Sequence, residues 1–501
     1  MAELEALVPT CKFLAIDAEM TSVRLSKDTE PAPDDSVQKR YTRMRAVASE
    51  LNLIQVGISL FHVDPHVDPQ SPEAYIARPY NFYVFPDEGP IGFNPRVNME
   101  ASGIAFNKRH KMDFNNWVYN GVTYVTAEGE AAFEKQILIG DDGSLKRKEV
   151  VLTKEADQKA LADLVQGIEK WAASGNSAEK EFKVPGSEAL NSFMRLALYQ
   201  EVERRYPELV CEGRPLFEGD RYKIQVFLLR INEQEKAERK CKQEEEQRKK
   251  LLAKLGFRRV FKLLAASKRP IVFHNGLFDL LFLYTHFEGN LPEDVNAFKT
   301  KLHSLFPEVY DTKVIATSDL FGRNLPEFPN TALEELFVAT RNSTKNGTGH
   351  VRIQLGEGFE RYAGSSGAFH EAGYDAYVTG CVFAQLEPRF REVRERFKNR
   401  VYLLRSVLQF NVTGADEQAE PKAIIHVSNF PKDTDTAGLL AIFDGLESPV
   451  RIQWINDTSA FAIIDDQSKL SQAVSIASSR TEANVIPAAE FFANSADKVT
   501  Q

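Results

Sequence analysis

The sequence predicts an α/β protein with more than one domain, and three observations support this. Short apolar runs typical of buried strands alternate with stretches whose apolar residues recur at helical spacing. The chain has 501 residues, which is too long for one ordinary hydrophobic core. A highly charged segment and, further along, a polar segment that ends in proline interrupt the apolar pattern, as domain boundaries do.

The first part of the chain alternates strands with a helix. FLAI is the first predicted strand, and its apolar run turns polar at Asp17 and Glu19. Residues 24–36 are rich in Pro, Asp and Ser and are expected to form a loop. The helix that follows is predicted from residues at helical spacing, namely Tyr41, Met44, Ala48 and Leu51. Strand character resumes at 52–61 and at 80–86, where a proline closes the run.

The middle of the chain indicates an inserted module at 178–248. A short helix is expected there from Phe193, Leu196, Leu198 and Tyr199. Residues 222–231 predict a strand, and the mixed charges of 232–250 predict an exposed helix. The apolar residues of 251–267 should then pack on the first domain.

A second small α/β unit is expected near the C-terminus. KAIIHVSNFP and SAFAIID predict two strands on either side of a helix at 436–443. The predicted organisation is a core in two parts, 1–177 and 249–410, with the insert 178–248 between them. A linker at 411–421 and a terminal domain at 422–495 follow.

The composition indicates which binding partners and which cellular compartment to expect. The net charge is −9 and the pI about 5.7, so a nucleic acid would have to be attracted locally, by metal ions or by small basic patches such as 108–111. The four cysteines lie far apart, which favours a reducing compartment without disulfides. No secretory signal and no apolar run of about 20 residues is visible, so we expect no membrane partner.

Two acidic residues end the first strand. Asp17 and Glu19 are two positions apart, so both side chains should project from one face of the sheet. Carboxylates next to buried apolar residues are costly unless a positive group binds them. Oxygen ligands in this arrangement suit hard divalent cations.

Three further residues complete a candidate site. Asn275 and Gly276 suit a helix start, which places Asp279 in the first turn; the alternative is an ordinary acid that interacts with the helix dipole. Asp375 is expected to open another helix, with His370 on the loop before it. A histidine beside a metal site is suited to act as a general base, with an unperturbed pKa near about 6.5.

Four carboxylates and one histidine in this order match the pattern of a two-metal 3′→5′ exonuclease. The chain resembles the poly(A)-specific ribonuclease family of the DEDDh exonuclease superfamily from about residue 12 to residue 495. The matching segments include YNFYVFP, FNPRVNMEASGIAF, DFNNWVYNGV, FHNGLFDLLFLY, YDTKVIA, NTALEELF, HEAGYDAYVTG and WINDTSAF. The resemblance implies a ribonuclease H-like exonuclease core that hydrolyses the 3′-terminal phosphodiester and releases 5′-AMP. It also implies two Mg²⁺ ions, for which Mn²⁺ can substitute, held by Asp17, Glu19, Asp279 and Asp375, with His370 as the base.

The same resemblance implies positions that contact RNA. In the core they are Val23, Ile104, Phe106, Lys313 and Leu333, of which the apolar ones would stack on adenines and the lysine would meet a phosphate. The insert resembles an Arg-x-x-x-His nucleic-acid-binding module, with Arg195 and with Tyr199 at the histidine position. The alternative is that Arg195 is a surface residue of a packing helix.

The C-terminal domain resembles an RNA-recognition motif that lacks the usual stacking residues. His426 and Ser459 stand where aromatic residues normally stack bases. Trp454, expected just before the second strand, matches the tryptophan that binds the 7-methylguanosine cap in this family, and a cation over an indole ring is favourable. A core tryptophan is the alternative.

One departure from the family pattern bears on function. Met20-Thr21-Ser22 follows the first acidic pair, where the family has Phe-Ser-Gly, and a glycine there would let the backbone approach the substrate closely. The resemblance implies a cap-stimulated, homodimeric enzyme that removes poly(A) from mRNA in the nucleus and cytoplasm. The departure keeps two alternatives open: a catalytically impaired RNA- or cap-binding adaptor, and an enzyme that trims the 3′ ends of non-coding or small RNA.

Overall fold

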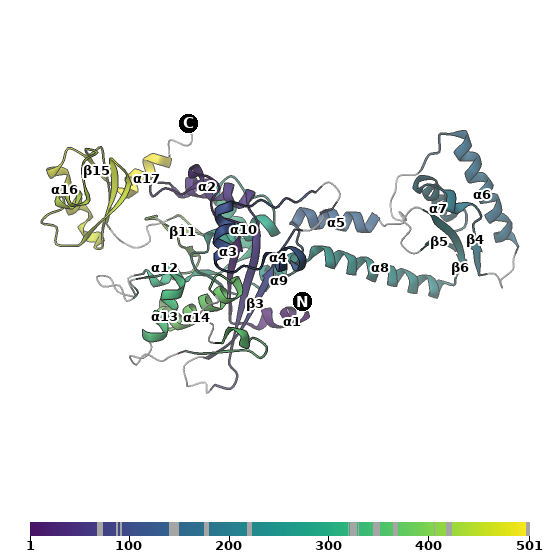
Figure 1. Cartoon of the computed structure of the whole chain (residues 1–501), viewed down its shortest axis with the longest axis horizontal. Helices are drawn as coiled ribbons and strands as arrows, with labels where there is room; N and C mark the ends of the chain where they lie inside the picture. Colours follow the sequence, from purple (N-terminus) through teal and green to yellow (C-terminus); the bar gives the residue numbers. More distant parts are fainter. Residues whose placement is uncertain are drawn as a thin grey trace. The chain divides into compact units, whose positions relative to one another are not determined.

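The structure is a computed structural model that describes residues 1–67, 74–86, 89–90, 93–139, 150–174, 180–217, 223–318, 320, 328, 330–343, 351–363, 369–404, 406–416 and 423–496. They form two compact units (Figure 1). The first consists of Met1–Glu88, Pro95–Ala127 and Gly256–Gln501, and the second of Gly89–Asn94 and Glu128–Leu255. The predicted mixed α/β fold is confirmed. None of the helices in the described ranges is long and apolar enough to cross a membrane.

A six-stranded mixed sheet in the order β8-β7-β1-β2-β3-β9 forms the centre of the first unit. Its strands are β1 (Phe13–Met20), β2 (Leu53–Val63), β3 (Ala74–Tyr83), β7 (Ile271–Phe273), β8 (Val309–Asp311) and β9 (Arg352–Leu355). β1 is antiparallel to β2 and parallel to β7, so the first acidic strand lies in the middle of the sheet. The strand predicted at 80–86 begins earlier, at Ala74, and ends at Tyr83.

Helices cover both faces of this sheet. One face packs against α2 (Val37–Glu50), α9 (Arg258–Ser267), α10 (Leu277–Phe287) and α11 (Val295–Leu305). The other packs against α12 (Thr312–Ala316), α13 (Leu333–Ser343) and α14 (Ala372–Phe390). Because side chains alternate along a strand, Ile16 and Ala18 of β1 enter the first cluster, whereas Phe13 and Ala15 enter the second. The remaining elements of this part are α1 (Ala2–Leu7), α3 (Ala101–Arg109), α4 (Phe114–Asn120), β10 (Arg400–Val401) and β11 (Phe410–Asn411).

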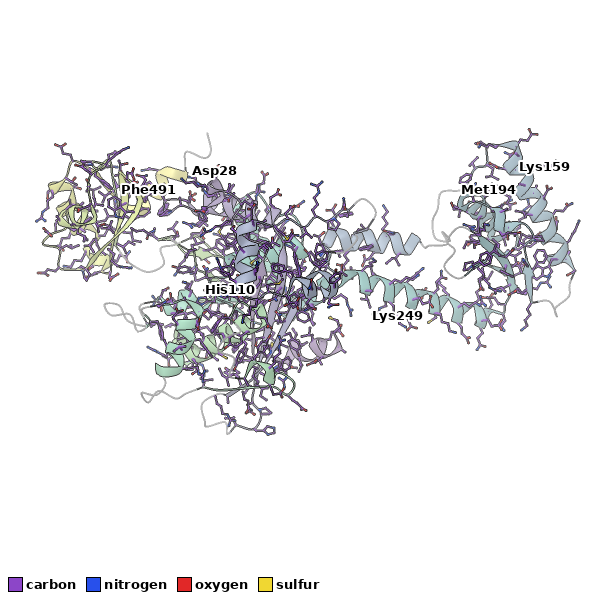
Figure 2. The ribbon with its side chains drawn as sticks, in the orientation of Figure 1. Asp28, His110, Lys159, Met194, Lys249 and Phe491 are labelled. Atoms are coloured by element: carbon purple, nitrogen blue, oxygen red, sulfur yellow. The ribbon has the colours of Figure 1, made fainter. Side chains whose placement is uncertain are left out.

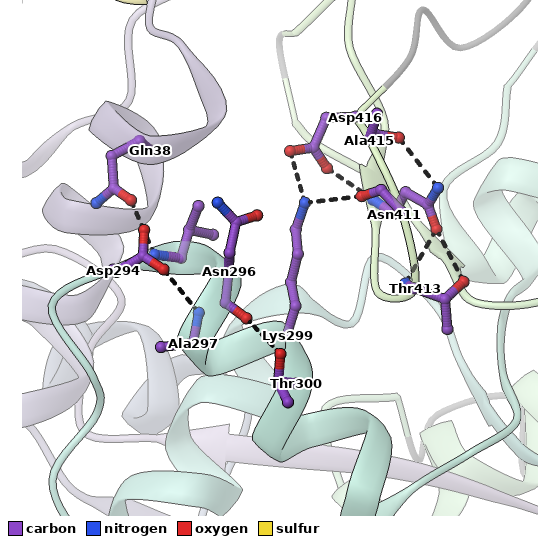
Figure 3. Close-up of polar contacts among 12 residues, drawn as sticks. Gln38, Asp294, Asn296, Ala297, Lys299, Thr300, Asn411, Thr413, Ala415 and Asp416 are labelled. Carbon is purple, nitrogen blue, oxygen red and sulfur yellow. Dashed lines mark hydrogen bonds and ion pairs between the residues drawn. The ribbon is translucent and has the colours of Figure 1, made fainter.

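A buried ion pair fixes the end of this α/β core (Figure 3). The Lys299 ammonium on α11 lies 2.7 Å from Oδ2 of Asp416, and the two side chains are only 5% and 16% exposed. The other oxygen of Asp416 accepts a hydrogen bond from the Asn411 backbone N–H at 2.9 Å. The first residues of the predicted linker 411–421 are therefore anchored to the core, and residues 417–422 lie outside the described residues.

The second unit contains a small three-stranded sheet in the order β4-β6-β5. Its elements are α5 (Ala127–Ile139), α6 (Glu155–Ala173), β4 (Glu181–Lys183), α7 (Ser192–Arg205), β5 (Leu209–Pro215), β6 (Ile224–Arg230) and α8 (Glu233–Leu255). Ile168 of α6 and Leu198 of α7 share an apolar cluster with Leu228 of the central strand. The unit is wider than the 178–248 predicted from sequence because α6 supplies part of this cluster. The exposed helix predicted at 232–250 is confirmed as α8, whose side chains, including Lys249, project into solvent (Figure 2).

Residues 423–496 form a four-stranded antiparallel sheet in the order β13-β14-β12-β15. The elements are β12 (Ala423–Ser428), α15 (Thr436–Ala441), β13 (Val450–Asn456), β14 (Ser459–Ile464), α16 (Leu470–Arg480), β15 (Asn484–Pro487) and α17 (Ala488–Ala496). The two predicted strands are present as β12 and β14. Trp454 precedes the second predicted strand, β14, as expected, but it lies within a further strand, β13, that was not predicted. β13 is an edge strand whose residues are half-buried or exposed, so its apolar pattern is weak.

Candidate active site

The closeness of β2 to α14 brings the acidic residues of two elements together. Gly57 of β2 is paired with Asp17 of β1, and a Cβ atom at Gly57 would lie 1.8 Å from the carbonyl oxygen of Ala372. Only glycine therefore lets the first turn of α14 rest on the sheet at this point. The side chain of Gln55 accepts a hydrogen bond from the Ala372 N–H at 3.1 Å and so satisfies a free donor of the helix end. Asp375, in the same helical turn, is held beside the acids of β1.

Three of the predicted site residues form a cluster suited to a cation. Glu19, His370 and Asp375 each offer one ligand atom, and these atoms lie within 4.8 Å of one another. His370 has a φ of +70°, a strained conformation for a residue other than glycine, and its N–H donates to Oδ2 of Asp375 at 2.9 Å. Oδ1 of Asp375 is buried and has no hydrogen-bond partner among the described residues. An unsatisfied carboxylate oxygen in this position fits a bound cation.

The other two acids belong to the same buried site. Burial raises the pKa of Asp17, and the nearby charges of Asp279, Asp375 and Glu19 raise it further. The pKa of Glu19 is raised for the same reasons, burial first. Burial also raises the pKa of Asp279 and of Asp375 to about 7. Four carboxylates that disfavour each other's charge need positive compensation, and their oxygen atoms are the ligands that Mg²⁺ and Mn²⁺ prefer.

Asp311, which the sequence prediction missed, fixes the turn that carries Asp279. Its buried carboxylate accepts hydrogen bonds at 2.9–3.2 Å from four backbone N–H groups, those of Asn275, Gly276, Lys313 and Tyr402. Asn275 has a φ of +57°, and Gly276 is the residue that precedes α10. Asp279 lies in the first turn of α10, as predicted. The only sequence signal for Asp311 was its place in YDTKVIA, at the end of an apolar run.

His370 contacts two rings, that of Phe106 on α3 and that of His110, the residue that follows this helix. The ring centroid of His110 lies 3.8 Å from that of His370, and the centroid of Phe106 lies 5.1 Å away in an edge-to-face arrangement. Burial lowers the pKa of His370, and the charge of His110 lowers it further. His370 is therefore kept neutral, which a general base requires. Sequence reasoning placed His110 only in a basic patch and missed this contact.

Residues 20–22, where the chain departs from the family pattern, pack tightly against α3. The Thr21 hydroxyl donates to the carbonyl oxygen of Asn98 at 2.8 Å. A Cβ atom at Gly103 of α3 would lie 2.1 Å from the carbonyl oxygen of Thr21 and 2.7 Å from Cβ of Ser22. Residue 22 is therefore not the glycine of the family pattern; instead, Gly103 on the facing helix α3 lets this helix and residues 21–22 approach closely. The same helix carries Phe106.

The other predicted RNA contacts of the core show different degrees of exposure. Val23 is 44% exposed. The Lys313 ammonium lies 5.3 Å from the ring centroid of Tyr402, and Leu333 packs partly buried against a cluster that includes Tyr374. Ile104 is half-buried on α3, beside the helical turn of Phe106.

The predicted contacts outside the α/β core lie on α7 of the second unit and in the C-terminal four-stranded domain. Arg195 on α7 donates to the carbonyl oxygen of Leu190 at 3.3 Å, while Tyr199 packs on the apolar cluster of the second unit. The half-buried Trp454 donates from Nε1 to the Thr436 hydroxyl at 3.1 Å. Its ring meets Phe430 edge-to-face, with centroids 5.6 Å apart.

The raised carboxyl pKa values predict how stability depends on pH without metal. The pKa of Asp279 and Asp375 is about 7 in the folded chain, whereas an unfolded Asp loses its proton near its ordinary pKa of 3.8. The folded state therefore binds more protons between these values, and stability should fall as the pH rises from about 4 to 7. In EDTA we expect a lower melting temperature at pH 8 than at pH 6, with Mg²⁺ restoring part of the loss at pH 8. Thermal unfolding followed by circular dichroism checks this, and a Mg²⁺ effect that persists in the Asp279→Asn, Asp375→Asn double variant would contradict it.

Comparisons with known proteins identify the family of this chain. The chain matches the CAF1 family of ribonucleases over residues 1–383. Poly(A)-specific ribonuclease PARN of Homo sapiens is 28% identical over 497 residues, covering 92% of this chain and 74% of that protein. The Xenopus laevis PARN is 26% identical over 495 residues, covering 92% of this chain and 75% of that protein. The pre-piRNA 3′-exonuclease trimmer of Bombyx mori is 28% identical over 379 residues, covering 75% of this chain and 66% of that protein.

A solved structure of S. pombe Pop2p in a Mg²⁺- and Mn²⁺-bound form aligns with 80% of this chain and 93% of that chain. Its TM-score is 0.36 at 13% identity, so this likeness carries no argument about the site. The family match, by contrast, spans all four carboxylates and His370. The chain belongs to the CAF1 family of ribonucleases.

Proposed function

We propose that this protein is a Mg²⁺-dependent 3′→5′ exoribonuclease that shortens poly(A) tails and releases 5′-AMP. The observation that carries the proposal is the approach of Glu19, His370 and Asp375 to within 4.8 Å of one another beside two more buried acids. The relatives from Homo sapiens and Xenopus laevis are named poly(A)-specific ribonucleases, which supports the choice of substrate.

The chain's own residues divide the chemistry between them. Asp17, Glu19, Asp279 and Asp375 would hold two Mg²⁺ ions, for which Mn²⁺ can substitute. When bound, the ions supply a more acidic attacking water and stabilise the departing 3′ oxygen. His370, which is kept neutral, would accept a proton from the attacking water as the water oxygen bonds to phosphorus. The bond between phosphorus and the 3′ oxygen then breaks, and the 3′ oxygen takes up a proton from solvent to leave as a hydroxyl.

The RNA contacts follow the family pattern. Phe106 lies against His370, and together with Val23, Ile104 and Leu333 it would stack on or wedge the terminal bases. Lys313 would meet a phosphate. Arg195 of the second unit would extend the contact with RNA, and a homodimer through the nuclease core, in the nucleus and cytoplasm, remains an expectation from the resemblance.

The C-terminal domain would bind the 5′ cap of mRNA and so stimulate the enzyme. Its order β12-α15-β13-β14-α16-β15, with β12 and β14 central, is that of an RNA-recognition motif and supports this part of the proposal. Trp454 is half-buried, so one side of the indole can remain available to a cationic purine.

Replacement of Trp454 by alanine should remove cap stimulation and spare the basal reaction. Loss of a cation–π contact of about 1–2 kcal/mol predicts a fivefold to thirtyfold weaker response to capped RNA. The measurement compares kcat/KM on capped and uncapped RNA with the same 3′ tail. Because the indole also packs in its domain, Trp454→Phe serves as a packing control, and equal loss on both RNAs would contradict the cap assignment.

A second candidate function is the trimming of small or non-coding RNA, which is favoured by the likeness to the Bombyx mori trimmer. The third alternative, an adaptor with impaired catalysis, depends on the departure at residues 20–22. Hydrolysis of oligo(A) and of a mixed-sequence RNA of equal length separates the three. Faster hydrolysis of oligo(A) supports the proposal, equal rates support a trimmer, and tight binding without product supports an adaptor.

A further inference from the structure

The C-terminal sheet has a second face that the proposed cap site does not use. One face packs on α15 and α16 around Ile425, Leu439 and Ala473. Trp454 belongs to this side, because it packs against the same cluster. The other face is covered by α17, which follows β15 without a loop and folds back across the sheet. The apolar cluster on this face also includes Val407 and Leu408, from the segment that precedes the domain.

Two aromatic side chains lie side by side at the centre of the covered face. His426 of β12 is paired directly with Phe461 of β14, and their ring centroids lie 5.5 Å apart. β12 and β14 are the two central strands. Adjacent rings on the central strands of a four-stranded sheet are the positions from which such sheets stack unpaired RNA bases. Sequence reasoning counted His426 as a poor substitute and missed Phe461, which lies two residues beyond Ser459.

Helix α17 places its own rings where bases would stack. The Phe491 ring lies over His426 with centroids 4.0 Å apart and planes at 32°, and Phe492 stacks on Phe461 at 5.8 Å and 28°. His426 is 6% exposed, and its Nδ1 has no hydrogen-bond partner among the described residues. A phenyl ring cannot satisfy this nitrogen, so the closed arrangement leaves a buried polar atom without a partner, which is costly.

The contact can be released without loss of the domain's main core. α17 has nine residues, too few for a stable isolated helix, so it depends on this apolar contact. Its apolar partners form a small cluster, which contains Val407, Ile424 and Phe461 and is separate from the core around Ile425.

We propose that α17 is a removable lid over a second site for single-stranded RNA, in which Phe491 occupies the place of a base on His426 and Phe461. The inference rests on the proposed function only in taking RNA as the ligand. Displacement of the lid would allow the enzyme to hold an unpaired segment of its substrate away from the nuclease site.

The test uses the full chain carrying Asp279→Asn, in EDTA, so that the RNA is not hydrolysed. The lid is opened with Phe491→Ser and Phe492→Ser, and the matched control, Ala489→Ser and Asn494→Ser, changes two exposed neutral positions of the same helix. The probe is a fluorescent, uncapped, 12-nucleotide RNA of mixed sequence, and its binding is followed by anisotropy. Hydrogen exchange of residues 488–496 reports whether the helix has detached, and a chain that ends at Pro487 replaces the serine variant if it has not.

We expect the open variant to bind the RNA about tenfold more tightly than the control, since one or two stacked bases change affinity by that order. His426→Ala with Phe461→Ala should abolish the gain in the open variant, while exchange in β12 and β14 shows that the sheet remains folded. An unchanged affinity with α17 detached, or a gain that survives both alanine substitutions, would overturn the proposal. The absence of 5′-AMP release by the wild-type chain would instead refute the proposed nuclease function and leave this binding result intact.

Discussion

Replacement of Asp279 by asparagine is expected to lower kcat for 5′-AMP release by about a thousandfold, with little change in KM. The substitution keeps the volume of the side chain but removes one negative charge from the four that would hold the ions. Loss of the charge stabilisation that a bound ion supplies costs several kcal/mol in the transition state, and each 1.36 kcal/mol is a factor of about ten in rate. Steady-state kinetics on a 3′-tailed RNA at saturating Mg²⁺ measure the effect.

The matched control is Asp294→Asn. Asp294 is an exposed residue whose side chain caps α11 by accepting from the Ala297 N–H at 2.8 Å, and asparagine caps a helix equally well. The control should therefore retain wild-type kinetics. Wild-type kcat in the Asp279 variant would show that this acid is a structural residue of the helix start.

Replacement of Asp311 by alanine should destabilise the core and weaken metal binding together. Four backbone N–H groups lose their acceptor in a buried place, which should cost about 3 kcal/mol or more in the free energy of unfolding. The turn at 275–276 would lose its anchor, so Asp279 would be held less rigidly. Residues that orient metal ligands typically affect metal affinity or activity by about 10–100-fold.

Two measurements separate these effects of Asp311. Thermal unfolding reports stability, and the Mg²⁺ concentration that gives half-maximal activity reports the site. Asp416→Ala is the control, because it breaks the buried pair with Lys299 and should lower stability without changing the Mg²⁺ requirement. An Asp311 variant that is destabilised but shows the wild-type Mg²⁺ requirement would contradict the positioning role.

Sequence patterns predicted the parts of the fold in which local periodicity and burial agree. The apolar run before Asp17 is a central strand, the spacing of Tyr41 and Met44 is that of a helix, and Asp279 lies in a first helical turn. β13 was missed because an edge strand alternates weakly between buried and exposed positions. The start of the inserted unit was placed too late because α6 packs on residues far from it in sequence.

In the candidate site, too, sequence patterns could not predict contacts between residues that are far apart in the chain. Its acids and histidine could be named from motifs, because charged residues next to apolar runs are conspicuous. The supporting contacts depend on three-dimensional closeness: Asp311 to the turn of Asn275, and His110 to His370. Gly57 and Gly103 could not be recognised as close-approach positions before their neighbours were known.

Product analysis on a 3′-tailed RNA tests the central claim most directly. The full chain is incubated with labelled RNA in Mg²⁺ and in EDTA, alongside Asp279→Asn, and the products are identified by mass spectrometry. Our account predicts stepwise release of 5′-AMP from the 3′ end in Mg²⁺ and none with EDTA or the variant. Well-folded protein that releases no nucleotide, or that releases it equally in EDTA, would contradict the account. It would mean that the metal-dependent 3′ exonuclease site is not formed by Asp17, Glu19, Asp279, His370 and Asp375.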